Sequence, residues 1–220
     1  MRTQRRKSAP KVRNGKVQKK NRWQRTQNCY NVYQPEPVID RRRPGKDHRH
    51  VVSKRDMERF IRLIPEWDKI AVGLDVIIID SKRESCMGWF RPTFVAICAW
   101  EREVIWEECS DDFFEDHREI LDKLGVPYHF NGDDDDLKER NRLRRNYECT
   151  WKYDWTVEWT ENTARAFSLA HVFVHELGHH HDCMTTKSKS DACRGESYAE
   201  RYARVREDVI IERYFNEFGY

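Results

Sequence analysis

Two histidines and a glutamate within five residues are the part of this sequence best spaced for metal chemistry. The segment His175-Glu176-Leu177-Gly178-His179 places the two histidines four residues apart. On a helix, residues four apart project from one face a single turn apart, so both imidazoles can reach one tetrahedral zinc ion. Glu176 is rotated by about 100° from His175, which keeps it out of the coordination sphere but beside a zinc-bound water.

This spacing predicts hydrolysis of a peptide bond. One zinc ion per chain, held by His175 and His179, would lower the pKa of a water molecule towards about 7 and polarise the peptide carbonyl. Glu176 would take the proton from that water and later pass it to the leaving amine. The predicted catalytic residue is therefore Glu176, and the predicted substrate is a protein or peptide.

A catalytic zinc site also needs a third protein ligand and an open fourth position. The metzincin motif would place glycine at 182 and histidine at 185, but this chain has Asp182 and Thr185, so that class is excluded. Downstream, Glu196 and Glu200 lie one turn apart on a predicted helix, and either can point at the metal. Asp191, on the polar loop before that helix, is a weaker candidate.

The two motifs together resemble those of the ImmA/IrrE-type zinc metallopeptidases, within the broader glutamate-zincin group. In that family a Glu-x-x-Ala-x-x-Phe-Ala helix follows the His-Glu-x-x-His motif. This chain has Glu196-x-x-Ala199-x-x-Tyr202-Ala203 at that place, with tyrosine at the aromatic position. The resemblance covers roughly residues 163–205. It implies a zincin-like fold with Glu196 as the third zinc ligand, and it makes Glu200 a supporting residue.

Other polar side chains around the motif have structural interpretations as well as chemical ones. His171, one turn before His175, is interpreted as a hydrogen-bonded core histidine rather than an accessory ligand. His180 and His181 face other sides of the helix, where they support the site or are exposed. Asp182 is a candidate to hold the free ring nitrogen of a ligand histidine.

Three further features near the motif lead to expectations. Tyr198 and Tyr202 are both candidates to stabilise the transition state beside the substrate carbonyl. Gly178 costs a helix interior about 1 kcal/mol relative to alanine, which suggests close approach of a strand or of substrate. Cys183 and Cys193 bracket a polar loop, so a local cross-link or an extra metal contact is an alternative to ordinary thiols.

Hydrophobic spacing indicates the elements that must position these residues. Apolar residues recur at steps of three and four across residues 163–182, which predicts a buried helix of about five turns. Two more helices are expected near residues 57–64 and 113–124, the second capped at Ser110. Extended segments are expected at residues 72–79, 93–100 and 104–106, the last two forming a hairpin across residues 101–103.

These elements predict an α+β, zincin-like metallopeptidase domain over residues 56–220. A small β-sheet from residues 72–106 would pack on the active-site helix, and its edge strand would bind substrate in an extended conformation. Residues 1–55 form a separate basic arm. They contain few aliphatic residues to bury, so the arm is expected to be disordered without a partner.

The charge distribution supports this division of the chain. The formal charge of the whole chain is only +3, but residues 1–55 carry 18 Lys and Arg against three acidic residues, a charge of +15. An alternative function is therefore a nucleic-acid-associated regulatory protein with a zinc site, binding through residues 1–50. Trp23, Tyr30 and Tyr33 would stack on bases there. A third possibility is that the arm docks on the acidic body as an inhibitor.

Cysteine content and hydropathy predict the compartment. Seven cysteines, an odd number, indicate reduced thiols rather than a disulfide framework. No apolar stretch of secretory type follows the first charges, and no apolar run is long enough for a membrane span. The chain is therefore expected to be cytoplasmic, with no membrane partner.

Overall fold

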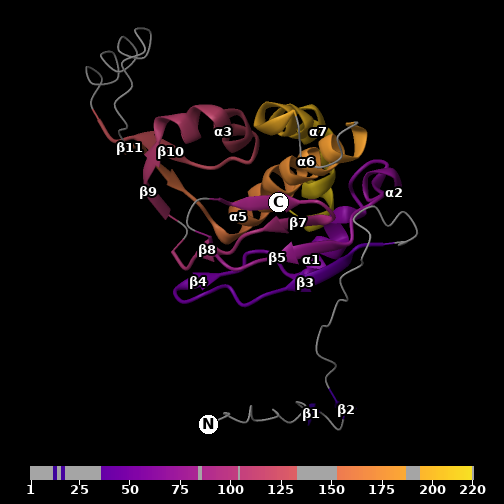
Figure 1. Ribbon diagram of the computed structural model, residues 1–220. Coiled ribbons are helices and arrows are strands. Elements are labelled where there is room, and N and C mark those ends of the chain that lie inside the picture. Colours follow the sequence, from indigo (N-terminus) through magenta and orange to yellow (C-terminus); the bar gives the residue numbers. More distant parts are fainter. Residues whose placement is uncertain are drawn as a thin grey trace, which may run out of the picture.

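The computed structural model describes residues 36–83, 86–103, 105–132, 153–186 and 194–219, together with two short strands near the N-terminus. Those strands are β1 (Val12–Arg13) and β2 (Lys16–Val17), which pair with each other. The described part of the chain mixes helices with small β-sheets, as Figure 1 shows. None of its helices is long and apolar enough to cross a membrane.

A four-stranded sheet with the order β3-β5-β7-β6 lies beneath the helices. Its strands are β3 (Val38–Arg41), β5 (Val76–Ile79), β7 (Phe94–Ile97) and β6 (Gly88–Arg91). The first three run parallel, whereas β6 runs antiparallel to β7 and forms one edge. All four residues of β5 are buried, as expected for a run of β-branched residues inside a parallel sheet.

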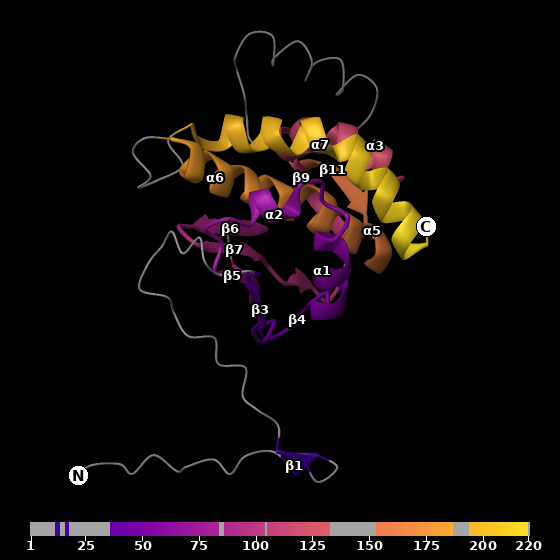
Figure 2. The ribbon, with the colours of Figure 1, turned by 90° about the vertical axis from the view of Figure 1, so that its right-hand side faces the viewer.

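A long helical segment packs on this sheet and is covered in turn by the C-terminal helix. Its parts are α5 (Glu161–Phe167), the π-helical turn η1 (Ser168–Phe173) and α6 (Val174–Thr185), and the covering helix is α7 (Gly195–Phe218). Figure 2 shows α6 between α7 and the edge strand β6. The helix predicted for residues 163–182 is confirmed, except that its middle turn is π-helical rather than α-helical.

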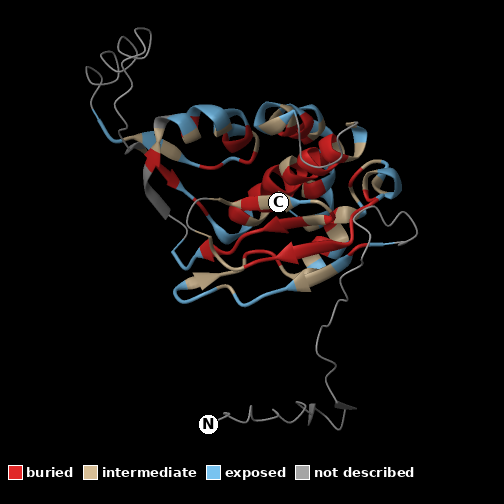
Figure 3. Cartoon of the chain, viewed as in Figure 1, coloured by how far each residue is buried: buried red, intermediate tan, exposed pale blue. Residues whose placement is uncertain are grey.

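Aromatic side chains fill the core between these layers. Phe60, Phe167, Phe173 and Tyr214 are almost completely buried, and the Phe60 ring meets those of Phe173 and Tyr214 edge-on at centroid distances of 6.1 and 6.3 Å. Figure 3 shows the buried residues concentrated on the sheet and on the helix above it. The helix that carries the candidate site is therefore anchored in the densest part of the molecule.

Of three further helices in the described part of the chain, the first and third match predicted segments, and the short second one was not predicted. They are α1 (Lys54–Ile61), the short α2 (Trp67–Ile70) and α3 (Asp111–Lys123). Ser53 forms a capping box with Asp56 at the start of α1, and the Ser110 hydroxyl accepts from the amide of Phe113 at the start of α3. Gly125 follows α3 with φ of +62°, the left-handed conformation common after a helix. The helices predicted near residues 57–64 and 113–124 are confirmed.

The predicted hairpin across residues 101–103 is wrong. The second sheet has the order β10-β11-β9, with strands β10 (Tyr128–Phe130), β11 (Tyr153–Glu158) and β9 (Ile105–Ser110). Strand β9 pairs with β11, whereas β7 pairs with β5 and β6. Between them, β8 (Trp100–Glu101) pairs with β4 (His48–Arg49). The charged residues thus connect two sheets, because long-range pairing wins over the local turn.

The predicted boundary at residue 55 lies too late in the chain. Strand β3 pairs in parallel register with β5, and Val51 and Val52 are buried in the core. The fully buried carboxylate of Asp80 also accepts a hydrogen bond from Arg42 at 3.0 Å. Composition predicted disorder here because apolar side chains are few. Backbone pairing to a buried strand does not depend on side-chain type, so the segment is ordered all the same. The rest of the predicted disordered arm, residues 1–35, lies outside the described residues apart from β1 and β2.

Candidate metal centre

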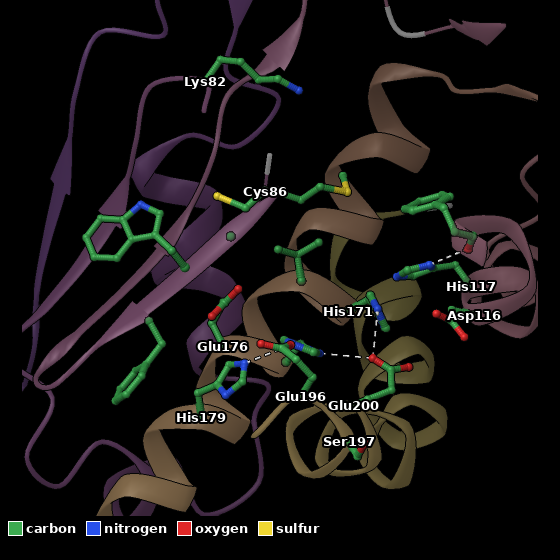
Figure 4. A pocket seen from close by; sticks show the side chains of 17 residues that line it. Lys82, Cys86, Asp116, His117, His171, Glu176, His179, Glu196, Ser197 and Glu200 are labelled. Atoms are coloured by element: carbon green, nitrogen blue, oxygen red, sulfur yellow. Dashed lines mark hydrogen bonds and ion pairs between the residues drawn. The ribbon is translucent and has the colours of Figure 1, made fainter. Parts of the chain in front are cut away.

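Helix α6 presents the two histidines of the motif to a cleft beside β6. The rings of His175 and His179 lie 5.0 Å apart between centroids, and the ring of His179 stacks on Phe90 of β6 at 6.2 Å. Both side chains are largely buried, and Figure 4 shows His179 beside Glu176 and Glu196. The four-residue spacing thus produces the geometry that it predicts.

Close packing of α6 against α7 places the third candidate ligand, Glu196, near the two histidines. A Cβ atom added to Gly178 would lie 2.8 Å from the Cα of Ala199 and 3.0 Å from its carbonyl oxygen, so only glycine allows this approach. The expectation of a strand or substrate near Gly178 is wrong, because the close neighbour is helix α7. Glu196 lies three residues before Ala199, and the contact therefore brings its carboxylate to the two histidines.

His175, His179 and Glu196 form the one group in the described part of the chain whose ligand atoms could hold a metal ion. These three atoms all lie within 4.8 Å of one another. Oε2 of Glu196 is 3.1 Å from Nε2 of His175 and 3.4 Å from Nε2 of His179. Two imidazole nitrogens and one carboxylate oxygen match the donor set of a catalytic zinc site, which leaves a fourth position open.

Glu176 lies beside this group in a different environment from Glu196. Its side chain is buried under β6, where a Cβ atom added to Gly88 would come within 2.6 Å of Oε1 of Glu176. Burial raises the pKa of Glu176 to about 8, against the opposing charge of His175. By contrast, the side chain of Glu196 is 83% exposed. A carboxyl group that exchanges its proton near neutral pH is suited to general acid–base work.

Glu200 is not one of the three candidate ligands. It contacts His175 at Nδ1, the ring nitrogen that does not face Glu196. Its Oε2 accepts a hydrogen bond from Nδ1 of His175 at 3.2 Å, which directs Nε2 of that ring towards Glu196. Burial opposes its ionisation, but hydrogen bonds from His175 and Arg204 and the charge of nearby His171 hold the pKa of Glu200 at about 2. Asp191, the other alternative ligand, lies outside the described residues.

The cleft that contains these groups has a volume of about 1050 Å³. On the β6 side the lining is mostly apolar and includes Met87, Trp89 and Phe90. The helical side carries the polar groups of α6, α7 and α3, together with the apolar Phe113 of α3 and Val172 of η1. The cleft is therefore open enough for an extended peptide chain and has one apolar side to bind it.

The two tyrosines predicted to stabilise the transition state do not line this cleft. The Tyr198 hydroxyl lies 2.7 Å from Nδ1 of His181, and the guanidinium of Arg194 stacks over the Tyr198 ring at 3.8 Å. Tyr202 is buried with Arg206 over its ring at 3.5 Å. Both rings lie on another face of α7 from Glu196, so neither supplies the oxyanion contact.

Other residues near the motif have structural partners. His171 is buried and hydrogen-bonds Glu207, which confirms its interpretation as a core histidine. His180 is buried and donates to the carbonyl of Val72 at 3.0 Å, and burial lowers its pKa to about 4.

The expectation that Asp182 holds a ligand histidine is wrong. Asp182 accepts from the backbone amide and Nε of Arg194, at 2.6 and 2.7 Å, and so fixes the start of α7. Cys183 is buried in α6. Its predicted partner Cys193 lies outside the described residues.

Two residues of the site were not predicted from the sequence. His117 of α3 lines the cleft, and its Nδ1 donates to the carbonyl of Phe113 at 2.7 Å. No local pattern around it indicates this position. Glu207 lies behind the metal group, and here a signal exists, since Glu196, Glu200 and Glu207 follow one another on one stripe of a helix.

Comparison with known proteins adds no relative. No family model matches the chain, and neither a curated protein nor a solved structure matches it. The similarity to ImmA/IrrE-type metallopeptidases therefore depends on the motif residues alone. What this site can do must be argued from its own geometry.

Proposed function

We propose that this protein is a zinc-dependent metallopeptidase with a zincin-like catalytic domain, similar to the ImmA/IrrE type. The observation that supports this most directly is the convergence of His175, His179 and Glu196 beside the buried carboxyl of Glu176. A structural zinc site is closed by four protein ligands, whereas three ligands at the wall of an open cleft are typical of catalysis.

The three side chains would hold one zinc ion through two imidazole nitrogens and a carboxylate oxygen. When bound, zinc supplies a Lewis acid that polarises a carbonyl and makes water more acidic. Glu200 keeps the proton of His175 on Nδ1, so that Nε2 has its lone pair free to bind. This arrangement of donors is set by the chain itself before any ligand arrives.

Glu176 is the proposed general base and acid. Its carboxylate would remove a proton from the attacking water at Oε1 or Oε2, and the carboxylic acid so formed would deliver that proton to the leaving amine. Burial under Gly88 excludes bulk water from this carboxyl and favours its protonated form, which assists the second step. Proton transfer by such a group contributes about 10²- to 10⁴-fold in rate.

The substrate is proposed to bind in an extended conformation along β6. This strand is an edge of its sheet, paired only with β7, and its Gly88 approaches Glu176 directly. The free edge can donate and accept main-chain hydrogen bonds from a peptide. Because those bonds do not depend on side chains, they place the scissile bond over Glu176 for many sequences, and pockets of the cleft would choose among them.

The test is a parallel measurement on wild type and Glu176→Gln. Elemental analysis should find about one zinc in both proteins, and a peptide library should be cleaved by wild type only, with at least about a 10²-fold loss in the variant. The amide keeps the size of the side chain but cannot accept the proton. A wild-type protein that takes up no zinc, or a variant that cleaves as fast as wild type, would refute the proposal.

A second function, nucleic-acid binding, is favoured by the charge of the N-terminal segment. Residues 1–35 carry 11 Lys and Arg and no acidic residue. A segment of this kind neutralises phosphates without reading sequence. It would bring the peptidase to proteins that are bound to DNA or RNA, so the two functions are compatible.

A further inference from the structure

A row of buried polar side chains extends from the back of the metal centre into the core. Oε2 of Glu200, which hydrogen-bonds Nδ1 of His175, also lies 3.8 Å from Nε2 of His171. Nδ1 of His171 in turn donates to Oε1 of Glu207 at 2.9 Å. The other oxygen of Glu207 lies 3.4 Å from the ammonium of Lys123, on α3. The row therefore joins three helical elements, α7, η1 and α3, to one ligand histidine of α6.

Burial of these polar groups costs free energy that an apolar core would not lose. His171 is 3% exposed and Glu207 only 1% exposed. Removing such groups from water is unfavourable, and apolar residues of similar volume often stabilise a core equally well or better. Glu207 pairs with His171 and Lys123. Glu200 pairs with His175 and, when the His171 ring is protonated, with His171, so the energy of the row depends on the whole set. Such a network fixes geometry more than it adds stability.

The backbone at His171 is also unusual. His171 lies in the π-helical turn η1, between α5 and α6. π-helical turns account for well under 1% of residues and occur frequently at functional sites. The ring of His171 lies 6.3 Å from that of His175 and stacks on Phe167 at 5.0 Å, so apolar packing also holds it in place.

Glu200 is held from two sides as a result. Its Oε1 accepts from Nε of Arg204 at 2.8 Å, while its Oε2 faces His175 and His171. Figure 4 shows His171 next to Glu200. In the described part of the chain, Oε2 contacts His171 and the ligand histidine that it orients, so removal of His171 would leave Oε2 with the ligand histidine alone. A carboxylate that can rotate would direct the histidine less well.

We propose that His171 and Glu207 are positioning residues of the metal centre, which fix Glu200 and through it the orientation of His175. This inference rests on the proposed function, because it assumes that His175 binds a metal. Contacts along the row would hold the His175 ring in one orientation relative to α3 and the core. Glu207 fixes His171 at the buried end of the row. Glu207 does not line the cleft and His171 is only 3% exposed there, so their effect should appear in metal binding itself.

The test compares Glu207→Met with Ser168→Ala. The methionine keeps the volume of the glutamate but cannot accept from His171. Ser168 is a matched control, since it is buried in the same π-helical turn and bonds Trp100 at 2.8 Å, away from the metal group. Zinc affinity is measured by competition with a chromophoric chelator, the geometry by the visible spectrum of the cobalt-substituted protein, and stability by thermal unfolding.

Glu207→Met should weaken zinc binding by about 10-fold, within the range seen when groups behind metal ligands are removed, and should shift the cobalt spectrum. Glu207→Gln, which restores an acceptor oxygen, should recover most of the affinity. Ser168→Ala should unfold at a lower temperature with zinc affinity and cobalt spectrum unchanged. A folded Glu207→Met protein with wild-type affinity and spectrum would overturn the inference.

If Glu207→Met does not fold, Lys123→Met tests whether the row affects zinc binding. The Lys123 side chain lies near the surface at the far end of the row. Its loss should weaken zinc binding about threefold, a reduced effect for a group one step further from the metal. Unchanged affinity in Lys123→Met would overturn the inference equally. Failure of the proposed function looks different, since the wild-type protein would then bind no zinc.

Discussion

At the scale of single residues, three glutamates with one chemistry have three environments. Glu176 is buried and its pKa rises to about 8, Glu200 is held by His175 and Arg204 with a pKa of about 2, and Glu196 is exposed at the mouth of the cleft. The motif spacing predicts His175, His179 and Glu176. Choice between Glu196 and Glu200 requires the crossing of α6 and α7, which no spacing along one helix determines.

Substitution at the two positions of α7 should separate ligand from support. Glu196→Ala removes a predicted zinc ligand and should lower zinc affinity at least 100-fold. Glu200→Gln keeps an oxygen near His175 and should lower it only about 10-fold, as expected for a group behind the ligand. The measurement is zinc affinity by chelator competition at fixed pH. Greater loss in Glu200→Gln than in Glu196→Ala would reverse the two assignments.

His117 should make the fold acid-sensitive. Burial, helped by the charge of His171, lowers the pKa of His117 to about 4 in the folded protein from its ordinary value of 6.5. Between these pH values the unfolded chain binds more protons, so the free energy of unfolding falls as the pH falls and is fully retained above about 6.5. The loss is at most about 3.5 kcal/mol, since each unit of pKa shift corresponds to about 1.4 kcal/mol.

The comparison is between wild type and His117→Phe, which keeps the ring on Phe113 but cannot titrate. Urea unfolding between pH 7 and pH 4.5, with a chelator present to exclude metal effects, should give a shallower pH dependence for the variant. His180 titrates in the same direction in both proteins and cancels in the difference. Parallel pH profiles would show that His117 does not contribute.

At the scale of elements, local patterns predict the helices better than their connections. Caps at Ser53 and Ser110 and apolar spacing over residues 163–182 indicate where helices lie. The π-helical turn at residues 168–173 is not predicted, because one extra residue per turn hardly alters a three- and four-residue pattern. The pairing of β9 with β11 joins residues about 50 positions apart, which no turn signal between residues 101 and 103 can reveal.

Gly178 decides the contact between the two helices of the site. Gly178→Ala should gain about 1 kcal/mol of helix propensity, but the new methyl meets backbone atoms of Ala199 that cannot rotate away. We expect a net loss of about 1 to 3 kcal/mol in the free energy of unfolding, as in overpacked cores. Displacement of α7 also moves Glu196, so zinc affinity should fall about 10-fold or more.

Two further variants test this explanation. Val205→Ala changes an exposed residue of α7 and should alter neither stability nor zinc affinity. Ala199→Gly should not rescue Gly178→Ala, because the clash involves the Cα and carbonyl oxygen of Ala199 rather than its side chain. A Gly178→Ala protein more stable than wild type would show that the helices separate without cost.

At the scale of the whole molecule, charge and fold divide the chain at different places. The charge division at residue 55 is a fact of composition, but β3 and the buried Val51 and Val52 belong to the fold. The segment that can be removed without cutting the sheet is therefore residues 1–35. Deletion of these residues should leave zinc content and unfolding temperature unchanged, and should abolish salt-dependent binding to a DNA or RNA oligonucleotide.

Deletion of residues 1–55 should have a different result. Comparison of the two truncations tests whether the fold begins at β3 or at residue 56. It removes β3 from its parallel pairing with β5, exposes one side of that strand and removes Val51 and Val52 from the core. Full burial of such a side chain contributes about 1.5 to 3 kcal/mol, so the loss for two valines alone approaches the margin of a typical domain. We expect the longer deletion to aggregate or to melt well below the shorter one. If both truncations fold with equal stability, β3 does not support the sheet, and the boundary at residue 55 is correct after all.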